Sequence, residues 1–316
     1  MFIDIILSPF VLLSSLCLKI VRRAGIKDMQ LSKEIFFKIG IYPLVDHYYE
    51  PQFNFSTLKK NLNEPRQLSG INWNDAEQLF LLKEFTFSYE LKQLKTTFTS
   101  PIEYYFGNNS FESGDAEIWY NLIRYIKPRK IIEIGSGHST NLARLALKYN
   151  TSEDPNHACL HICIEPYEMA WLEKLGIEII RQKVEDVDLS IFLQLEANDI
   201  LFIDSSHIIR PQGDVITEIF NILPCLKTGV IVHIHDIFSP RDYIQEWLKE
   251  DIKFWNEQYL LEAFLMFNPE WKIIGGLNYL KHKYPIELSN ACLHLTTDRE
   301  PGSFYIQKIS NSSINL

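Results

Sequence analysis

Residues 130–140 read KIIEIGSGHST, and this stretch decides the fold. Lys130–Ile134 is a short apolar segment typical of a buried parallel strand, and it runs directly into Gly135-Ser136-Gly137. Two glycines after a strand allow a tight turn and a close approach of the backbone to a ligand, and the following helix offers free N–H groups. The stretch therefore predicts a strand, a ligand-binding turn and a helix in succession.

Beyond this turn, apolar strand-like segments continue to alternate with helical ones. Strands are expected at 160–164, 177–180, 199–203, 229–234, 271–275 and 303–309, and helices at 140–148, 167–175 and 215–223. Such alternation indicates parallel βαβ units with right-handed crossovers. The predicted fold class is α/β, a doubly wound, mostly parallel Rossmann-like sheet over residues 101–316 with an N-terminal helical extension.

Polar residues follow the ends of consecutive predicted strands. Gly135, Glu165, Asp204 and the pair His235-Asp236 all stand just past a strand. In an open parallel sheet the carboxyl ends of the strands border the crevice in which ligands bind. Four such features in a row are much less expected by accident than one alone, so a ligand site is predicted at this edge.

Three acids in this region have the character of cofactor ligands. Glu133 would meet an ammonium group better than a pyrophosphate, and Glu165 could accept both hydroxyls of a ribose. Asp186 could accept a hydrogen bond from an adenine amino group, although its acidic neighbours could equally begin a solvated helix. The third position of the dinucleotide pattern is Thr140 rather than Gly or Ala, which weakens a nicotinamide interpretation.

As a set, these motifs resemble the class I S-adenosylmethionine-dependent methyltransferases over about residues 100–310. The blocks GDAE at 114–117, FIDSSH at 202–207 and VHIHD at 232–236 are similar to an uncharacterised bacterial branch often grouped with antibiotic and sugar O-methyltransferases. The resemblance implies a seven-stranded sheet whose final strand inserts antiparallel. It also implies that S-adenosylmethionine is bound by Glu133, Gly135, Ser136, Gly137, Ser139, Thr140, Glu165, Asp186 and Asp204.

The candidate reaction centre combines carboxylates and imidazoles. Asp204 and Asp236 would lie at neighbouring strand ends, within reach of a common cation such as Mg²⁺. The resemblance to metal-dependent sugar O-methyltransferases of the macrolide type implies that Asp204 binds the metal and that His207 takes the hydroxyl proton. Those enzymes place a carboxylate where this chain has His235. Either His235 completes the ligand set with Asp204 and Asp236, which suits Mn²⁺ better than Mg²⁺, or it acts as a base or substrate contact without a metal. His233 is expected on a different side of the strand from His235, as a core residue.

Composition narrows the partners. The formal net charge of −9 argues against nucleic acid, because phosphate binding needs a basic face. The five cysteines are an odd set without a CxxC pair, and Cys159 and Cys163, which bracket the start of a strand, are expected to be buried free thiols, which indicates a reducing cytosol. A small-molecule or glycan acceptor is the expected partner, and the aromatic run 254–260 is expected to pack a helix on the sheet rather than stack a sugar.

The first 100 residues show no catalytic pattern and are expected to form an accessory or cap region, with a helix at 74–94. Residues 2–23 are rich in Ile, Leu, Val and Phe, are interrupted by Asp4, Ser8 and Lys19, and end at Arg22-Arg23. Three interpretations stay open: a helix packed on the domain, an interfacial helix on a membrane, and a single span. The expected location is the cytoplasm, with possible membrane association.

Three function classes follow from the sequence. The first is O-methyl transfer to a sugar, glycan or natural-product hydroxyl, for example in polysaccharide biosynthesis. The second is a nicotinamide-dependent oxidoreductase, which would lack both the third glycine and a Tyr-x-x-x-Lys pair after the fourth strand. The third is a non-catalytic S-adenosylmethionine-binding module, against which the intact Asp204, His207 and Asp236 argue.

Overall fold

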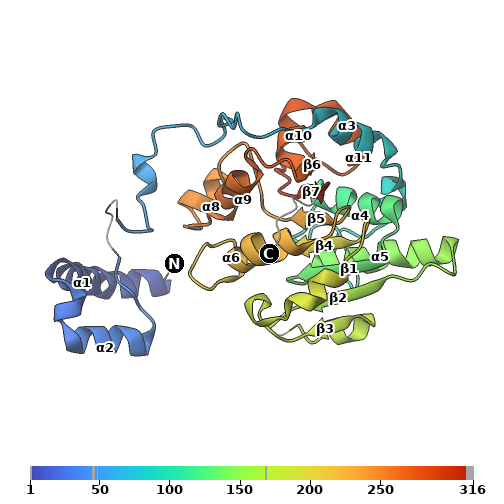
Figure 1. The fold of residues 1–316 in the computed structure, drawn as a ribbon. Coiled ribbons are helices and arrows are strands. Elements are labelled where there is room, and N and C mark those ends of the chain that lie inside the picture. The colour runs from blue at the N-terminus through green and yellow to red at the C-terminus, as the bar shows by residue number, and fades with distance from the viewer. Residues whose placement is uncertain (1, 45–46, 48, 168, 311–316) are drawn as a thin grey trace. The chain divides into compact units, whose positions relative to one another are not determined.

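The computed structural model describes residues 2–44, 47, 49–167 and 169–310, and the chain divides into two compact units (Figure 1). Unit 1 comprises Met1–Asn61 with Leu248–Phe254, and unit 2 comprises Leu62–Trp247 with Trp255–Leu316. The expected boundary near residue 100 differs from this division. Residues 62–100 belong with the sheet because Leu82, Phe85 and Leu91 are buried in its core.

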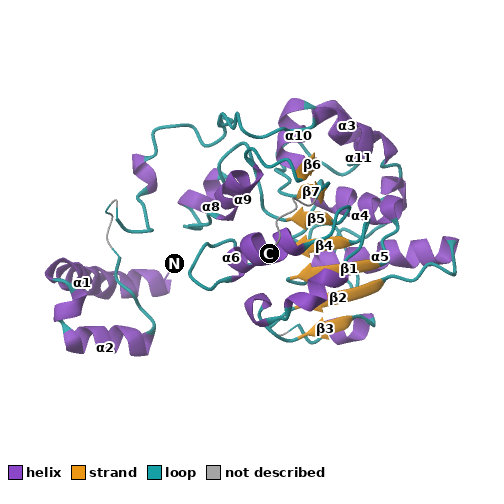
Figure 2. Cartoon of the chain, in the orientation of Figure 1, coloured by secondary structure: helices purple, strands orange, loops and turns teal. Residues whose placement is uncertain are grey.

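Unit 2 is built on one seven-stranded sheet (Figure 2). The strands are β1 (Lys130–Ile134), β2 (Leu160–Ile164), β3 (Glu178–Ile180), β4 (Ile200–Ile203), β5 (Ile231–Ile234), β6 (Trp271–Gly276) and β7 (Phe304–Lys308). Their order is β3-β2-β1-β4-β5-β7-β6, and β7 runs antiparallel to both of its neighbours while the other pairs are parallel. This confirms the predicted mostly parallel sheet with an antiparallel final strand.

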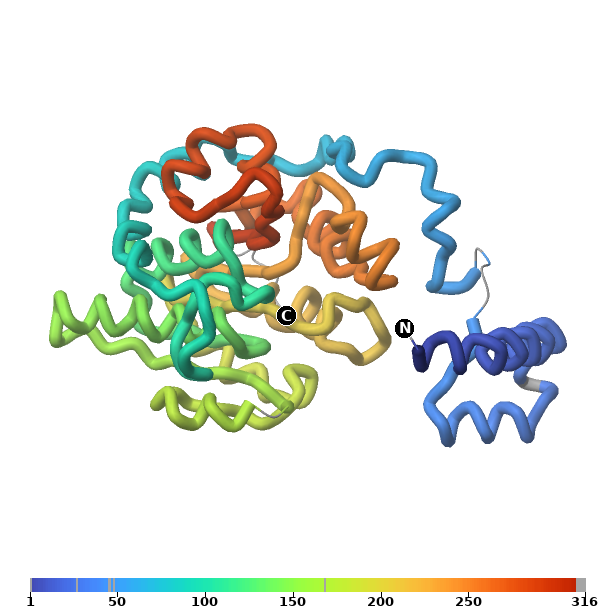
Figure 3. Tube along the Cα trace, turned by 180° about the vertical axis from the view of Figure 1, so that it is seen from behind, coloured from blue at the N-terminus to red at the C-terminus, as the bar shows by residue number. Residues whose placement is uncertain are grey.

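Helices cover both faces of the sheet. On one face α4 (Asp115–Ile126) and α5 (His138–Glu153) lie side by side, as Figure 3 shows from behind. The other helical elements of unit 2 are α3 (Asp75–Glu84), η3 (Phe87–Leu91), η4 (Leu172–Leu175), η5 (Val184–Asp186), η6 (Leu189–Gln194), α6 (Asp214–Ile216), η7 (Thr217–Ile222), α7 (Leu223–Cys225), α8 (Gln245–Lys249), α9 (Glu257–Leu265), α10 (Leu277–Lys283) and α11 (Pro285–Ala291). Two expectations need correction. In the described part of the expected helix at 167–175, the regular element is the short turn η4. The expected helix at 74–94 is two separate elements, α3 and η3.

The strands are rich in Ile and Val because both of their faces are buried. Ile132, Leu201 and Val232 point to one face, where they join the core formed with α6, η7 and α9. Ile131 and Phe202 point to the other face, against α4 and α5. The two cores hold the sheet rigid, so the strand ends are fixed positions on which a site can be built.

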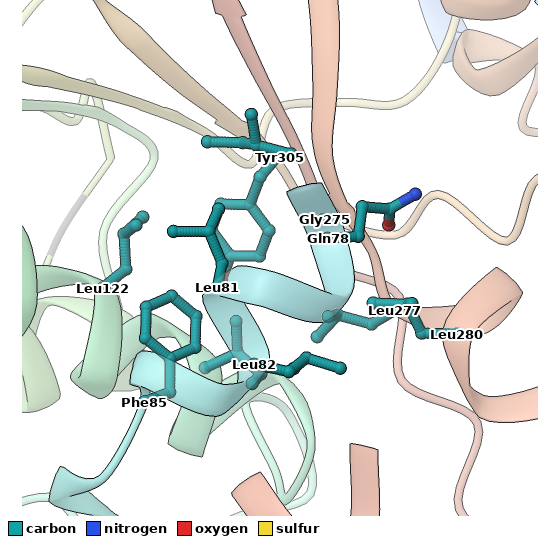
Figure 4. Close-up of a pocket in the computed structure, with 11 residues that line it drawn as sticks. Gln78, Leu81, Leu82, Phe85, Leu122, Gly275, Leu277, Leu280 and Tyr305 are labelled. Carbon is teal, nitrogen blue, oxygen red and sulfur yellow. The ribbon is translucent and has the colours of Figure 1, made fainter. Parts of the chain in front are cut away.

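A small apolar cavity lies in the core beside α3 (Figure 4). Leu81 and Leu82 of α3 and Phe85, the residue just after it, line it together with Leu122 and Leu277. Its volume is about 10 Å³, which leaves room for no more than about one water molecule. This cavity is therefore a packing gap and not a ligand site.

Unit 1 contains α1 (Phe2–Ala24), η1 (Ile26–Asp28), α2 (Gln30–Ile39) and η2 (Phe55–Thr57). No residue of α1 or α2 is buried. Among the described residues, α1 is the one helix long and apolar enough to cross a membrane, by length and composition alone.

Candidate active site

The turn between β1 and α5 places its two glycines in different backbone conformations. Gly135 has a φ of 80°, and a Cβ there would lie 2.1 Å from the carbonyl oxygen of Asp204, so only glycine fits. Gly137 has extended backbone, and a Cβ there would meet nothing within 4 Å. The Oγ1 of Thr140 accepts the N–H of Gly137 at 3.1 Å. The turn is therefore pressed against the end of β4 at its first glycine and open at its second.

Glu133 is fully buried on β1, beside two side chains of β2. Its Oε2 lies 3.1 Å from Nε2 of His161 and accepts the S–H of Cys163 at 3.3 Å. Its Oε1 and the Oγ of Ser136 are buried and have no hydrogen-bond partner in the described part of the chain. Because a buried polar atom without a partner costs free energy, these two oxygens mark a place for a ligand's donor.

A cavity of about 220 Å³, the acidic cavity, lies at the carboxyl ends of β1, β2 and β4. It is lined by Ile134, Gly135, Ile164, Glu165, Pro166, Tyr167, Lys183, Val184, Glu185, Asp204, Ser205, Ser206, Arg210 and Asp214. The carboxylate of Glu165 accepts the backbone N–H of Ser136 at 3.2 Å and that of Tyr167 at 2.9 Å, which fixes it at the rim.

Asp186, the predicted adenine ligand, is exposed and does not line the acidic cavity. Its neighbour Glu185 does. Both belong to the 3₁₀ turn η5, in which successive side chains point about a third of a turn apart. Within this turn, Glu185 faces the acidic cavity and Asp186 faces solvent, so Glu185 is the acid placed to meet a ligand there.

A second cavity of about 410 Å³, the aromatic cavity, opens on the other side of Asp204. It is lined by Phe98, Pro101, Tyr105, Ser110, Phe111, Ser136, Gly137, His138, Ser139, Met169, Trp171 and Asp204. The predicted cofactor residues Ser136, Gly137 and Ser139 thus border this cavity. Asp204 borders both cavities and marks the point at which they meet.

The candidate reaction centre forms where β4 and β5 end side by side. Nε2 of His207 lies 3.3 Å from Oδ1 of Asp204 and 3.6 Å from Oδ2 of Asp236. Nδ1 of His235 lies 3.6 Å from Oδ1 of Asp204 and 3.5 Å from Oδ1 of Asp236. Two imidazoles therefore flank the same two carboxylates, and all four predicted residues come together.

Two buried acids lie behind the imidazoles: Glu257, which is outside every cofactor or reaction-centre motif named above, and Asp115, which belongs to the GDAE block. Nδ1 of His207 lies 2.8 Å from Oε2 of Glu257, the first residue of α9. Nε2 of His235 lies 3.9 Å from Oδ2 of Asp115, whose other oxygen accepts two backbone N–H groups just before β7. Glu257 stands inside the aromatic run 254–260, so an acid among apolar residues was the available signal.

The carboxylates raise the pKa of both imidazoles. Burial by itself lowers the pKa of His207, but the hydrogen bonds to Asp204 and Glu257 outweigh burial and raise it well above 6.5. Burial is likewise overcome at His235, where the charges of Asp236 and Asp204 raise the pKa to about 9. This cluster therefore favours positive charge, whether a proton or a cation.

Backbone strain coincides with the cluster. His207 has a φ of 59° and Asp236 a φ of 58°. Both angles lie in the left-handed region, which residues other than glycine seldom adopt. Such backbone conformations lower the stability of the folded state, and they persist where the surrounding structure enforces them, often at functional sites. The strain supports a functional rather than a merely structural role for these two residues.

In the described part of the chain, two groups of side chains have potential metal-ligand atoms within 4.8 Å of one another: Glu133, His161 and Cys163, which are buried, and Asp204, His207 and Asp236 at the reaction centre. The predicted metal set contained His235 in place of His207. His207 joins because its Nε2 points to the carboxylates while its Nδ1 is held by Glu257. Carboxylate oxygens with one imidazole are donors that suit Mg²⁺ or Mn²⁺.

His233 is a core residue, as expected, but the side predicted for it is wrong. Residues two apart along a strand face the same side, and the rings of His233 and His235 both lie against Phe111, at 6.3 and 5.1 Å. His233 also stacks on Tyr305 at 4.2 Å. Burial, reinforced by the charge of His235, lowers its pKa well below 6.5 and keeps it neutral.

Comparisons with known proteins identify a methyltransferase domain in part of the chain. Residues 132–237 match the family model of the methyltransferase domain. An uncharacterised protein of Archaeoglobus fulgidus is 33% identical over 168 residues, which are 48% of this chain and 73% of that protein.

Two solved structures are also similar to this chain. The plantazolicin methyltransferase BpumL, in complex with SAH and a pentazolic analogue, is 13% identical, with 75% of this chain and 97% of that chain covered and a TM-score of 0.37. The O-methyltransferase from Bacillus cereus, in complex with SAH, is 12% identical, with 77% and 100% covered and a TM-score of 0.36. Likeness at this level carries no argument about the reaction.

Proposed function

We propose that the chain transfers the methyl group of S-adenosylmethionine to a hydroxyl oxygen of a sugar, glycan or natural-product acceptor, on the basis of the methyltransferase-domain match over residues 132–237 and the seven-stranded sheet. The position of Asp204 and His207 carries this proposal. Asp204 borders both cavities, and His207, which lines neither of them, has its Nε2 3.3 Å from the Asp204 carboxylate, so a base stands directly behind the side chain that the two cavities share. A hydroxyl acceptor needs such a base, because its proton must leave as the oxygen attacks.

The residues around the glycine turn fit S-adenosylmethionine, which supplies a sulfonium methyl group when bound. The unpartnered Oε1 of Glu133 and Oγ of Ser136 offer acceptors toward the methionine ammonium. The open position beside Gly137 leaves room for the ligand against the backbone. Glu165 offers its carboxylate to the ribose hydroxyls, and Glu185 takes the place expected of Asp186 at the adenine.

His207 is positioned to accept the proton of the acceptor hydroxyl. Glu257 holds Nδ1, which fixes the ring and leaves Nε2 facing Asp204 and Asp236. A raised pKa makes the neutral imidazole a stronger base, and only the neutral ring can accept a proton. Turnover should therefore increase with pH along a limb whose midpoint lies above 6.5.

A divalent cation is a second part of the proposal. Asp204 and Asp236 would supply carboxylate oxygens, and a cation there would lower the pKa of the acceptor hydroxyl. His207 is not a ligand in this arrangement, because its Nε2 cannot bind the cation and accept the proton at once. His235 borders the same carboxylates and would help to fix their orientation.

The lining of the aromatic cavity supports a ring-bearing acceptor. Phe98, Tyr105, Phe111 and Trp171 border it, and aromatic faces pack well against the apolar face of a sugar or a planar natural product. Asp204 lies at the end of this cavity, so an acceptor hydroxyl placed there would approach His207.

Calorimetric titration with S-adenosylmethionine and with NAD⁺ tests the cofactor. Binding of S-adenosylmethionine is expected, and binding of NAD⁺ alone would overturn the proposal. Demethylated glycans and sugars, screened for incorporation of a labelled methyl group, then test the acceptor class. Labelled product that is stable to mild base indicates an ether, whereas a base-labile product would indicate a carboxyl ester and contradict transfer to a hydroxyl.

Replacing His207 by alanine tests the base. The variant should lose at least about a hundredfold in kcat, with an unchanged affinity for S-adenosylmethionine. His282→Ala is the matched control, because His282 lies on α10 and pairs at 2.9 Å with Glu300, away from the cluster. Full turnover of the His207 variant would refute the assignment, as would equal losses in both variants.

A further inference from the structure

The helix α1 shows a surface that its own unit does not cover. None of its residues is buried, and its apolar side chains include Ile6 at 50% and Leu13 at 64% exposure. The adjoining helix α2 also exposes large apolar side chains, among them Leu31 and Ile35. Exposed apolar area of this extent on a soluble protein marks an interaction surface.

Most polar residues of α1 form one stripe along the helix, and Ser14, which lies outside it, donates its hydroxyl to the carbonyl of Phe10. Asp4, Ser8, Ser15, Lys19 and Arg22 follow one another at spacings of four, seven, four and three residues, which return to the same side of an α-helix. The rest of the circumference is mostly apolar. A helix with a wide apolar face and a narrow polar stripe fits a water–lipid boundary, where one side is wet and the other is not.

The length of the uncharged segment favours a helix lying in the membrane plane over one that crosses it. Residues 5–18 contain no Asp, Glu, Lys or Arg, and this segment is about 21 Å long at about 1.5 Å per residue. The hydrocarbon core of a bilayer is about 30 Å thick. In a helix that crosses the membrane, the charges of Asp4 and Lys19 would therefore enter the hydrocarbon. In a helix that lies in the membrane plane, they stay among the lipid headgroups.

Basic side chains at the C-terminal end of the stripe favour lipids with anionic headgroups. Lys19 and Arg23 are exposed and one helical turn apart, while Arg22 pairs with Glu50. The hydroxyl of Ser8 donates to the carbonyl of Ile5 at 3.0 Å, so it adds little cost at the boundary. The ammonium group of Lys19 and the guanidinium group of Arg23, at the polar edge of the helix, complement anionic headgroups.

We propose that α1 binds in the plane of an anionic membrane surface, with Ile6 and Leu13 in the acyl region and Lys19 and Arg23 at the headgroups. The membrane is the occupant of this surface, and the proposal stands independently of the methyl acceptor.

Sedimentation of the full-length chain with vesicles tests the proposal. Vesicles of phosphatidylcholine with phosphatidylglycerol should carry the protein into the pellet, and those of phosphatidylcholine alone should carry much less. Replacing Lys19 and Arg23 by glutamine should weaken binding to the anionic vesicles by about fivefold for each residue. Protein that stays in solution with both kinds of vesicle would overturn the proposal.

Two matched double variants distinguish a helix lying flat from a spanning one. Ile6→Gln with Leu13→Gln changes the apolar face, and Ser8→Gln with Ser15→Gln changes the stripe at the same spacing and without altering charge. The first pair should weaken binding by at least about tenfold for each residue, and the second by less than about twofold. Equal losses would indicate a spanning helix and overturn the in-plane proposal. A dimer detected by light scattering in the absence of lipid, with α1 protected from proteolysis, would also overturn the in-plane proposal. Thermal unfolding of each variant, unchanged from the parent chain, shows that unit 2 is intact.

Discussion

Substituting Gly135 with alanine should destabilise the fold, whereas the same substitution at Gly137 should leave it intact. At a φ of 80°, an L-residue costs about 1–2 kcal/mol relative to glycine. The new Cβ would also lie 2.1 Å from the carbonyl oxygen of Asp204, a backbone atom at the end of β4 that cannot rotate away. To restore an ordinary contact the two segments must separate by roughly 1 Å or more. Together these effects should lower the free energy of unfolding by about 3 kcal/mol or more.

Gly137 differs in both respects. Its backbone is extended, and a Cβ there would meet nothing within 4 Å, so the free energy of unfolding should change by less than about 0.5 kcal/mol. The added methyl group would stand in the open position beside the aromatic cavity, where the proposed cofactor lies. The affinity for S-adenosylmethionine should therefore decrease by at least about tenfold, as about 1.4 kcal/mol of lost contact predicts.

Urea unfolding followed by tryptophan fluorescence measures the first effect, and calorimetry with S-adenosylhomocysteine the second. A Gly135→Ala protein as stable as the parent chain would refute the argument from contact with β4. A Gly137→Ala protein with unchanged affinity would show that the ligand does not approach this backbone.

Three further outcomes are expected. Asp75→Asn should lower the free energy of unfolding by about 1 kcal/mol at pH 7. Burial opposes ionisation of Asp75, but hydrogen bonds from Lys283, Tyr279 and Tyr284 lower its pKa below 3.8; the stabilisation is thus complete above that value, and the difference between the two proteins should vanish as the pH falls through the folded-state pKa. A difference that persists in acid would exclude the ionised carboxylate as its cause. His233→Phe should keep full activity and remain within about 1 kcal/mol of the parent stability, because both ring nitrogens lack hydrogen-bond partners in the described part of the chain; lost activity would reveal a chemical role. Prolonged chelation followed by assay should abolish turnover, and an unchanged rate would exclude the proposed cation.

The succession of strands along the chain and the edge at which the site forms followed from local patterns. Lys130–Ile134 and Leu160–Ile164 are apolar segments bounded by polar turns, and their predicted bounds are those of β1 and β2. Parallel connection then dictates that all strand ends carrying polar residues meet at one edge. Gly135, Glu165 and Asp204 could therefore be placed together without any knowledge of distances.

The shorter helical elements were less predictable. In the described part of 167–175, which leaves out residue 168, the regular element is η4, and a single 3₁₀ turn is too short for a sequence period to distinguish it from an α-helix. In the 3₁₀ turn η5, likewise, it is Glu185 and not Asp186 that lines the acidic cavity.

The sequence by itself determined the sheet, the glycine turn and the set Asp204, His207, His235 and Asp236, since these depend on residue periodicity and chain connection. Only the tertiary structure decided which imidazole faces the carboxylates with Nε2. That choice rests on Glu257, which lies 50 residues from His207 in the chain and 2.8 Å from it in space. A contact between α9 and the end of β4 depends on how two separate elements pack, and no local pattern encodes it.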